Sequence, residues 1–174
     1  MPQRGDELLA SRRAKLERLI QRGVDPFPAR FNRTHSTAEA ISAFSGAQSA
    51  TPVKAIVAGR VARIRRMGKA SFVDIEDSDG RLQLFVRSDV LGESYGLIDD
   101  IDLGDFVGAS GDLMRTRAGE ISLGVEDLVF LAKALRPPPE KFHGLRDVEQ
   151  RYRQRYLDLI ANKDVHDAMR ARSR

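Results

Sequence analysis

The sequence of 174 residues contains no cysteine and no tryptophan, and its apolar runs are too short and too often interrupted by charge to span a bilayer. The absence of cysteine excludes disulfide scaffolds, thiolate metal sites and thiol nucleophiles. Residues 1–6 lack the apolar core of a secretory signal. The 41% of apolar and 31% of charged residues are typical of a globular protein. We therefore expect a cytoplasmic protein without a membrane partner.

The usual patterns of catalytic and cofactor sites are missing as well. The three histidines, His35, His143 and His166, are far apart and show no spacing that suits a metal ion. The glycines do not form a phosphate-binding loop of the Walker or Rossmann type, and the serines have no neighbouring base motif. We expect no catalytic residue, no metal site and no bound cofactor in this chain.

The net charge of +4 conceals a segregation of charge along the chain. Residues 53–72 hold six basic residues and no acidic one, whereas residues 74–131 hold fourteen acidic and four basic residues. Such segregation can concentrate a positive field on one face, which favours a polyanionic partner. The alternative is a set of charged faces that contact only solvent, and charge alone does not decide between the two.

The N-terminal part, residues 1–52, is predicted to be largely helical. Residues 6–22 form an amphipathic pattern that Gly23 can end as a C-terminal cap. The apolar stripe of this helix consists of Leu9, Leu16, Leu19 and Ile20. Residues 36–52 indicate a short helix within a linker.

Residues 53–135 contain five β-rich runs separated by turn signals. The runs cover residues 53–65, 70–77, 81–87, 105–116 and 120–131. Residues 92–101, between the third and fourth runs, carry the core-type residues Tyr95, Ile98 and Ile101 at helical spacing. Three strands, a helix and two strands are the order of the OB-fold, a five-stranded Greek-key barrel that binds oligonucleotides. Gly59, within the first run, suits the bend that a small barrel needs. The fold class is therefore mainly β with flanking helices.

The C-terminal part, residues 136–174, begins with a stiff proline-rich spacer. A helix is predicted from Asp147, and a second helical stretch covers residues 164–174. The apolar positions at core-like spacing are Val148, Tyr152, Tyr156, Leu159 and Ile160. The last stretch has no stop signal, so we expect it to continue in a longer parent protein.

Alternation along the second and third strands assigns their side chains to two faces. Apolar residues such as Val73 and Ile75 belong inside the barrel, which leaves Phe72, Gln83 and Phe85 outside. A hairpin closed by residues 77–80 would place Phe72 opposite Phe85 and diagonal to Gln83. Exposed aromatic rings on an OB-fold stack on bases, and an amide can hydrogen-bond a base edge. The alternative is that the N-terminal helix or a partner subunit covers Phe72 and Phe85.

The basic run from Arg60 to Lys69 lies on the first strand and its turn, beside these aromatic residues. Such side chains contact phosphates or stack on bases in nucleic-acid-binding proteins. They also serve as a solubilising loop in proteins that bind no nucleic acid. Glu120, after the turn between the fourth and fifth strands, could accept a hydrogen bond from a base amino group.

Several strings resemble the class II lysyl-tRNA synthetases of bacterial type, from about residue 8 to the end. In the barrel they are RRMGKASF at 65–72, RLQ at 81–83, DLGD at 102–105 and RTRAGE at 115–120. After the barrel they are KALRP at 133–137, KFHGL at 141–145 and RYRQRYLDLI at 151–160. Aspartyl and asparaginyl enzymes share the barrel and a shorter piece of the last string. Residues 36–52 match nothing in particular.

The resemblance implies an anticodon-binding site. In the family, the aromatic residue that matches Phe72 stacks on the middle anticodon base, a uridine, and the glutamine that matches Gln83 hydrogen-bonds it. The glutamate that matches Glu120 contacts an anticodon base, and arginines at Arg60 and Arg65 line the same pocket.

The resemblance further implies a parent lysine–tRNA ligase that uses ATP and magnesium, forms a homodimer and has tRNA(Lys) as its partner. The family's class II catalytic motifs lie beyond the matched strings, so we expect this chain alone to be inactive. Two other interpretations stay open: a general single-strand-binding OB module, and a barrel that serves mainly as a subunit contact. The barrel of an aspartyl or asparaginyl enzyme is a third.

Overall fold

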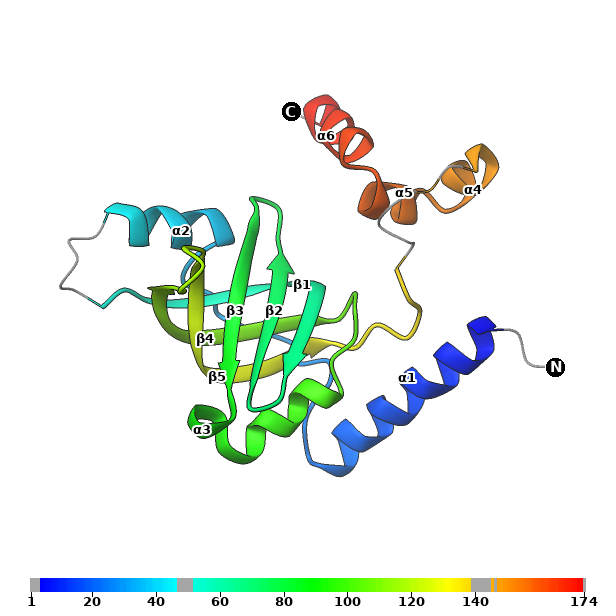
Figure 1. Ribbon diagram of the computed structural model, residues 1–174. Helices are drawn as coiled ribbons and strands as arrows, with labels where there is room; N and C mark the ends of the chain where they lie inside the picture. The colour runs from blue at the N-terminus through cyan, green and yellow to red at the C-terminus, as the bar shows by residue number, and fades with distance from the viewer. Residues whose placement is uncertain (1–3, 47–51, 139–144, 146, 174) are drawn as a thin grey trace. The chain divides into compact units, whose positions relative to one another are not determined.

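A computed structural model describes residues 4–46, 52–138, 145 and 147–173. The chain divides into two compact units, one up to Leu135 and one from Arg136. The first unit contains a closed five-stranded barrel, and the second contains three helices (Figure 1). Of the sequence strings above, residues 141–144 lie outside the described residues, as does His143.

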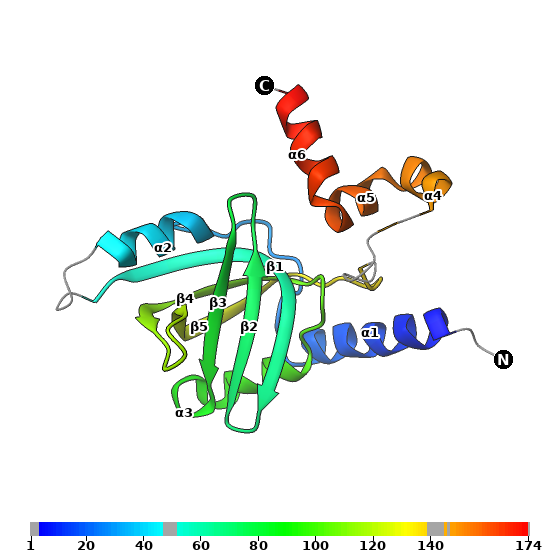
Figure 2. The same cartoon turned by 45° about the horizontal axis from the view of Figure 1, so that its top comes forward.

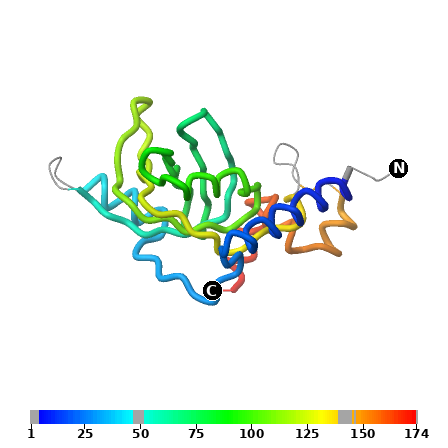
Figure 3. The backbone as a smooth tube through the Cα atoms, turned by 90° about the horizontal axis from the view of Figure 1, so that it is seen from below, coloured from blue at the N-terminus to red at the C-terminus, as the bar shows by residue number. Residues whose placement is uncertain are grey.

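The barrel strands are β1 (Lys54–Met67), β2 (Ala70–Glu76), β3 (Arg81–Arg87), β4 (Phe106–Arg115) and β5 (Ile121–Ala132). Around the barrel their order is β1-β2-β3-β5-β4, and the ring closes between β4 and β1. Neighbouring strands are antiparallel except β3 and β5, which pair in parallel. Figure 3 shows the ring of strands from below. The five strands begin and end within two residues of the predicted runs, and the OB-fold prediction is confirmed.

The strand β1 is long because it pairs with two neighbours in succession. Its first half, up to Arg60, pairs with β4, and the part from Arg60 onward pairs with β2. The strand changes partner next to Gly59, where a Cβ atom would lie 2.9 Å from the carbonyl oxygen of Glu76. Gly59 therefore permits a close approach of two backbones, which is the more specific reason for a glycine inside this strand.

The barrel interior consists mostly of aliphatic side chains from all five strands, together with the fully buried ring of Phe130. Val73, Ile75, Leu82, Leu84 and Val86 are at most 1% exposed, as their alternation predicts. Each strand of the β2–β3 hairpin therefore has one apolar face that is buried and one face that points outward. This division determines which residues are available to a ligand.

The helix α1 (Arg4–Gln21) is held against the barrel mainly by polar contacts. Arg12, only 7% exposed, donates to the carbonyl oxygens of Leu103 and Ala134, and Arg18 forms an ion pair with Asp100. Leu19 is fully buried, but Ile20 is 57% exposed, so its assignment to the apolar stripe is wrong. The helix ends where expected, with Gly23 at a φ of 72°.

Lys133 completes this polar contact region from inside. Its fully buried Nζ donates to Asp102 and Asp105 at 2.7 Å and 2.8 Å, and to the carbonyl oxygen of Asp100. Lys15 of α1 pairs with the other oxygen of Asp102. Burial opposes the ionisation of Asp102, but the hydrogen bonds from Lys133 and Lys15 outweigh it and lower the pKa of this carboxyl. The helix α1 thus contacts the 100–105 loop and residue 134. None of these contacts involves the outer face of β2 and β3.

The segment predicted as a helix over residues 92–101 is largely a 3₁₀ helix, η1 (Gly92–Asp99). The short helix α3 (Ser88–Leu91) precedes it and lies outside the predicted segment. Gly92 stands between them with a φ of 55°, a value that ends a regular α-helix. Ile98 and Ile101 are nonetheless buried in the core, as their spacing predicted.

The helix α2 (Thr37–Gly46) lies against one end of the barrel (Figure 2). Asp77 of the β2–β3 turn caps this helix. The carboxylate accepts from the backbone N–H and the hydroxyl of Thr37, at 2.9 Å and 2.7 Å. It also accepts from the backbone N–H groups of Asp79 and Gly80, which shapes the turn itself. Burial opposes the ionisation of Asp77, but these hydrogen bonds outweigh it and lower its pKa from 3.8.

We expect Asp77→Ala to lower the free energy of unfolding by about 1–3 kcal/mol, because the buried N–H and hydroxyl of Thr37 lose their acceptor. Since folding lowers the pKa of Asp77, its contribution is complete above about pH 4 and is lost as the pH falls through the lowered pKa. Thermal unfolding from pH 7 to pH 3 should therefore show a difference from the wild type that shrinks on acidification. Asp79→Ala, which changes an exposed neighbour, is the control. A difference that is constant with pH would contradict the role of the charge.

The second unit contains α4 (Val148–Arg153), α5 (Arg155–Ala161) and α6 (Lys163–Arg172). Asp147 caps α4 by accepting from the backbone N–H of Gln150. Asp158, fully buried, accepts hydrogen bonds from Arg151, Arg155 and Asn162. The predicted core positions in this unit are largely exposed: Val148 61%, Tyr152 71%, Tyr156 55% and Ile160 42%. A buried carboxylate organises these helices, and their apolar spacing forms no core within the unit.

Candidate nucleic-acid interface

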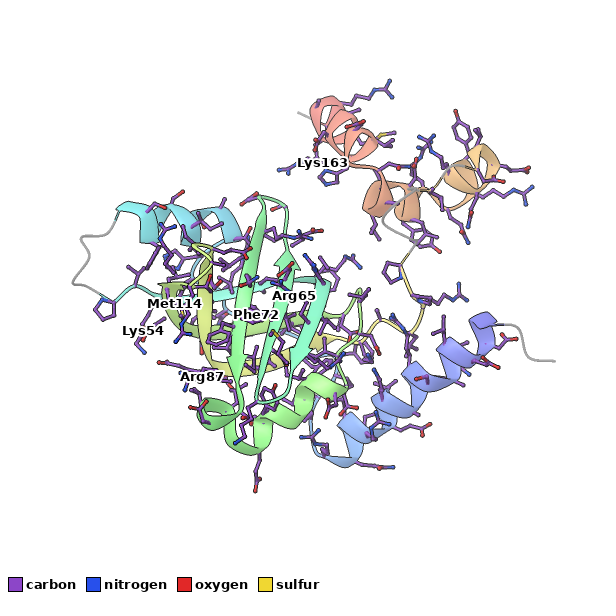
Figure 4. All side chains as sticks on the ribbon, in the orientation of Figure 1. Lys54, Arg65, Phe72, Arg87, Met114 and Lys163 are labelled. Atoms are coloured by element: carbon purple, nitrogen blue, oxygen red, sulfur yellow. The ribbon has the colours of Figure 1, made fainter. Side chains whose placement is uncertain are left out.

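The outer face of β1, β2 and β3 carries a row of three stacked side chains. Phe72 pairs with Phe85 in the hairpin register, and their ring centroids are 4.9 Å apart at an interplanar angle of 25°. On the other side, Arg65 pairs with Phe72, and its Cζ lies 5.3 Å from the centre of that ring. Figure 4 labels Arg65 and Phe72 beside each other on the barrel. We call Arg65, Phe72 and Phe85 the stacking row.

Both rings of the stacking row keep part of their surface exposed, and Arg65 is exposed. The predicted pairing of Phe72 with Phe85 is confirmed. Phe85 covers one face of Phe72 and the exposed Arg65 guanidinium lies over the other, so an unstacked base can stack on Phe72 where Arg65 moves aside. The guanidinium of Arg65 adds a positive charge beside this ring.

The β1–β2 turn next to the row is held by Tyr95 of η1. The Tyr95 hydroxyl donates to the carbonyl oxygen of Gly68 and shares a hydrogen bond with the buried Ser71, both at 2.9 Å. Gly68 has a φ of 66°, which the turn requires of it. These contacts fix the turn that connects Arg65 to Phe72. Sequence reasoning missed Tyr95, since its helical spacing indicated only a core position.

Gln83 lies on the same outer face but is only 4% exposed, so its expected exposure is wrong. Its Nε2 donates to Oε2 of Glu120 at 2.9 Å, and its Oε1 accepts from the Ser122 hydroxyl at 3.1 Å. The physical reason is the parallel pairing of β3 with β5, in which Gln83 stands opposite Ser122. Gln83 and Glu120 are thus brought together, although both were expected to be free.

Glu120 is placed by the turn between β4 and β5. The backbone N–H and the hydroxyl of Thr116 donate to the carbonyl oxygen of Glu120, and the backbone N–H of Glu120 donates to the Thr116 hydroxyl. Gly119 reverses the chain direction with a φ of 86°. Glu120 itself is exposed. Its carboxylate therefore lies at the rim of the outer face, within reach of both Gln83 and solvent.

Asp74 is the cross-strand neighbour of Gln83, and sequence reasoning gave it no function. It is 5% exposed, and its Oδ1 has no hydrogen-bond partner within the described part of the chain. Asp74 has basic neighbours, since its register partner on β1 is Arg63 and its Oδ2 lies 4.0 Å from Nη1 of Arg81. Phosphate contacts are expected at Arg63 and Lys69, because both cations are exposed.

Arg60 lies near the middle of β1, five residues before Arg65. It pairs with Glu76 and Phe106, and its Cζ lies 4.4 Å from the centre of the Phe106 ring. Phe72 and Glu76 are four residues apart on β2, about 13 Å along a strand. Burial lowers the pKa of Arg60, although the guanidinium remains a cation at neutral pH. The structure therefore places Arg65, but not Arg60, against Phe72.

Arg66 differs from the other cations of the basic run. Its Nη2 donates to the carbonyl oxygens of Ile98 and Ile101 at 2.8 Å and 3.1 Å. These hydrogen bonds connect β1 to the end of η1 through the Arg66 guanidinium. Arg66 thus contributes to the fold, and the phosphate role expected for the whole run is better matched by Arg63 and Lys69.

The described residues contain no group of three or more histidine or acidic side chains arranged to hold a metal ion. None of their helices has the length and apolarity needed to span a bilayer.

Comparison with known proteins agrees with the geometry. The profile of the family described as "OB-fold nucleic acid binding domain" matches residues 55–131, which span β1 to β5. The chain is 48% identical to a lysine–tRNA ligase of Dehalococcoides mccartyi over 170 residues, 95% of the chain and 34% of the relative. It is 47% identical to that of Pediococcus pentosaceus over 178 residues, covering 99% of the chain and 36% of the relative. The same enzyme of Lysinibacillus sphaericus is 47% identical over 97% of the chain and 35% of its own length.

The fold and the stacking row define residues 55–131 as an OB-fold nucleic acid binding domain. Over nearly its whole length, the chain belongs to the lysine–tRNA ligase family. It spans about a third of the length of the curated relatives that it matches.

Proposed function

We propose that this chain binds the anticodon loop of tRNA(Lys), as the anticodon-recognition part of a lysine–tRNA ligase. The stacking row is the observation that carries the proposal. A base that stacks on the face of Phe72 opposite Phe85 gains about 1–3 kcal/mol, and for this the exposed Arg65 guanidinium must move from that face. Arg65, Gln83 and Glu120 surround the position of that base and supply the polar contacts.

The proposed site consists of Phe72, Gln83, Glu120 and Arg65, with Arg60 as a contact at the far end of the same face. In this site Phe72 stacks on the middle base, which we take to be uridine, while Gln83 and Glu120 hydrogen-bond base edges. Arg63 and Lys69 contact the phosphates and make the affinity depend on salt.

We further propose that the whole enzyme is a cytoplasmic homodimer that uses ATP and magnesium to activate lysine and transfer it to tRNA. The chain contributes recognition and no group of the chemical step. In this proposal the chain has three consecutive parts. Residues 1–52 flank the barrel, residues 53–135 bind RNA, and residues 136–174 connect the barrel to the catalytic domain.

A titration by fluorescence anisotropy tests the proposal. The chain should bind an RNA hairpin that carries the lysine anticodon in its loop more tightly than a fully paired stem of the same length. The physical reason is that only unpaired loop bases can lie on Phe72. Equal affinity for both RNAs would indicate that only phosphate contacts act. The absence of binding to either RNA would favour a barrel that serves as a subunit contact.

A further inference from the structure

The β1–β2 turn is a two-residue hairpin loop that carries the exposed cation Lys69. Met67 and Ala70 are register partners, so Gly68 and Lys69 alone form the turn. Gly68 has a φ of 66°, and glycine in this conformation at the first turn position is typical of a type II′ hairpin. Lys69 therefore has a defined place at the end of the basic strand β1, next to the stacking row.

Both peptide groups that flank the Cα atom of Lys69 are hydrogen-bonded to the α3–η1 segment. The Tyr95 hydroxyl donates to the carbonyl oxygen of Gly68, and the backbone N–H of Ser88 donates to that of Lys69, both at 2.9 Å. A peptide group is planar, so the orientation of the two planes on either side of a residue sets its backbone conformation. The two hydrogen bonds therefore fix the direction in which the Lys69 side chain leaves the backbone.

The Tyr95 hydroxyl is the middle of a chain of two hydrogen bonds. A carbonyl oxygen only accepts, so the single proton of this hydroxyl is used for Gly68. Both bonds can then exist together only if the Ser71 hydroxyl, 2.9 Å away, donates to the Tyr95 oxygen. Removal of the Tyr95 hydroxyl thus releases the turn, whereas removal of the Ser71 hydroxyl leaves the bond to Gly68 in place.

We propose that Tyr95 is a positioning residue for RNA binding, which holds the β1–β2 turn so that Lys69 contacts a phosphate of the bound loop. This inference rests on the proposed function, in which Lys69 is one of the phosphate contacts. A backbone that is already fixed in the free protein loses less conformational entropy when the RNA binds. Tyr95 then contributes to the affinity and to its salt dependence, and it does not affect the choice of base.

The experiment measures dissociation constants at several salt concentrations for two RNA hairpins that differ only in the middle anticodon base, uridine or cytidine. Tyr95→Phe keeps the ring and removes the hydroxyl. We expect this variant to bind both hairpins about two- to fivefold more weakly at low salt, the scale of one exposed ion pair. The slope of log Kd against log salt should fall by up to about one, towards the slope of Lys69→Ala. The ratio of the two dissociation constants should stay at the wild-type value.

The double variant Tyr95→Phe/Lys69→Ala distinguishes positioning from a general loss of packing. If Tyr95 acts through Lys69, the double variant binds as weakly as Lys69→Ala alone, and the two effects do not add. If Tyr95 only stabilises the fold, its removal weakens binding whether or not residue 69 is charged, and the two effects add in full.

Ser71→Ala is the matched control, because it removes a buried hydrogen bond of the same tyrosine hydroxyl and leaves the bond to Gly68. This variant should keep the wild-type salt slope. Tyr95→Phe leaves the buried Ser71 hydroxyl without its Tyr95 partner, which lowers stability. If that variant does not fold, Tyr95→Phe/Ser71→Ala removes both hydroxyls and should show the same lowered slope.

The outcomes separate this inference from the proposed function. A wild-type salt slope in Tyr95→Phe or in the variant that lacks both hydroxyls overturns the role of Tyr95 and leaves anticodon binding intact. Effects of Tyr95→Phe and Lys69→Ala that add in full, or a wild-type slope in Lys69→Ala, overturn it as well. A wild-type chain that binds the uridine hairpin no more tightly than a fully paired stem overturns the proposed function itself.

Discussion

Replacing Gly111 with alanine is expected to lower the free energy of unfolding by about 3 kcal/mol or more, and to abolish RNA binding with it. A Cβ atom at Gly111 would lie 1.9 Å from the carbonyl oxygen of Gly124, a distance that no repacking of a side chain can relieve. The contact is between the backbones of β4 and β5, next to an irregularity in their register. The two strands would have to separate locally.

The consequence for function follows from the position of Gly111. The turn between β4 and β5 positions Glu120 beside Gln83, and β5 positions Ser122 beside Gln83. Both positions depend on the pairing of β4 with β5. Denaturant unfolding followed by circular dichroism measures the loss of stability. Gly46→Ala is the control, because nothing lies within 4 Å of a Cβ at that position. If Gly111→Ala unfolds at the wild-type denaturant concentration, the close β4–β5 contact is wrong.

Phe72→Ala is expected to weaken binding of the lysine anticodon hairpin by about 1–3 kcal/mol, a roughly 5- to 150-fold rise in the dissociation constant. Two contacts are lost at once, since Phe72 is both the surface for the base and the ring between Arg65 and Phe85. The fold should persist, because Phe72 lies on the outer face and the core residues Val73 and Ile75 point inward.

Phe27→Ala is the control for the loss of an exposed aromatic side chain. Phe27 follows α1 and is 52% exposed, and its removal should leave binding unchanged. Thermal unfolding of both variants separates binding from stability. If Phe72→Ala lowers the unfolding temperature and keeps the wild-type affinity, Phe72 is a packing residue and the stacking row is not the binding surface.

The strands and the stacking row could be predicted from the sequence, because both depend on short-range patterns. Alternation along β2 and β3 decides which side chains point inward, and the turn between them fixes Phe72 opposite Phe85. Gly23 and the helix before it also follow from local signals. These elements agree with the structure, since tertiary contacts reinforce the local preference at each of them.

The surroundings of Gln83 could not be predicted in the same way. Gln83 and Ser122 are 39 residues apart, and nothing in either segment signals the parallel pairing that joins β3 to β5. The exposure of Ile20 has a similar cause. The helix α1 is held by ion pairs such as that of Arg18 with Asp100, which are 82 residues apart in the sequence. A prediction from the apolar stripe alone therefore assigns more apolar residues to the buried face than the structure does.

The central claim is that this barrel recognises the middle base of a lysine anticodon. The most direct test is the ratio of the dissociation constants for the uridine and cytidine hairpins, measured with the wild-type chain at several salt concentrations. Phosphate contacts weaken equally for both RNAs as salt rises, whereas a base contact does not. We expect tighter binding of the uridine hairpin, with a ratio that is independent of salt. Equal affinities at every salt concentration would contradict anticodon recognition and indicate a general single-strand-binding module.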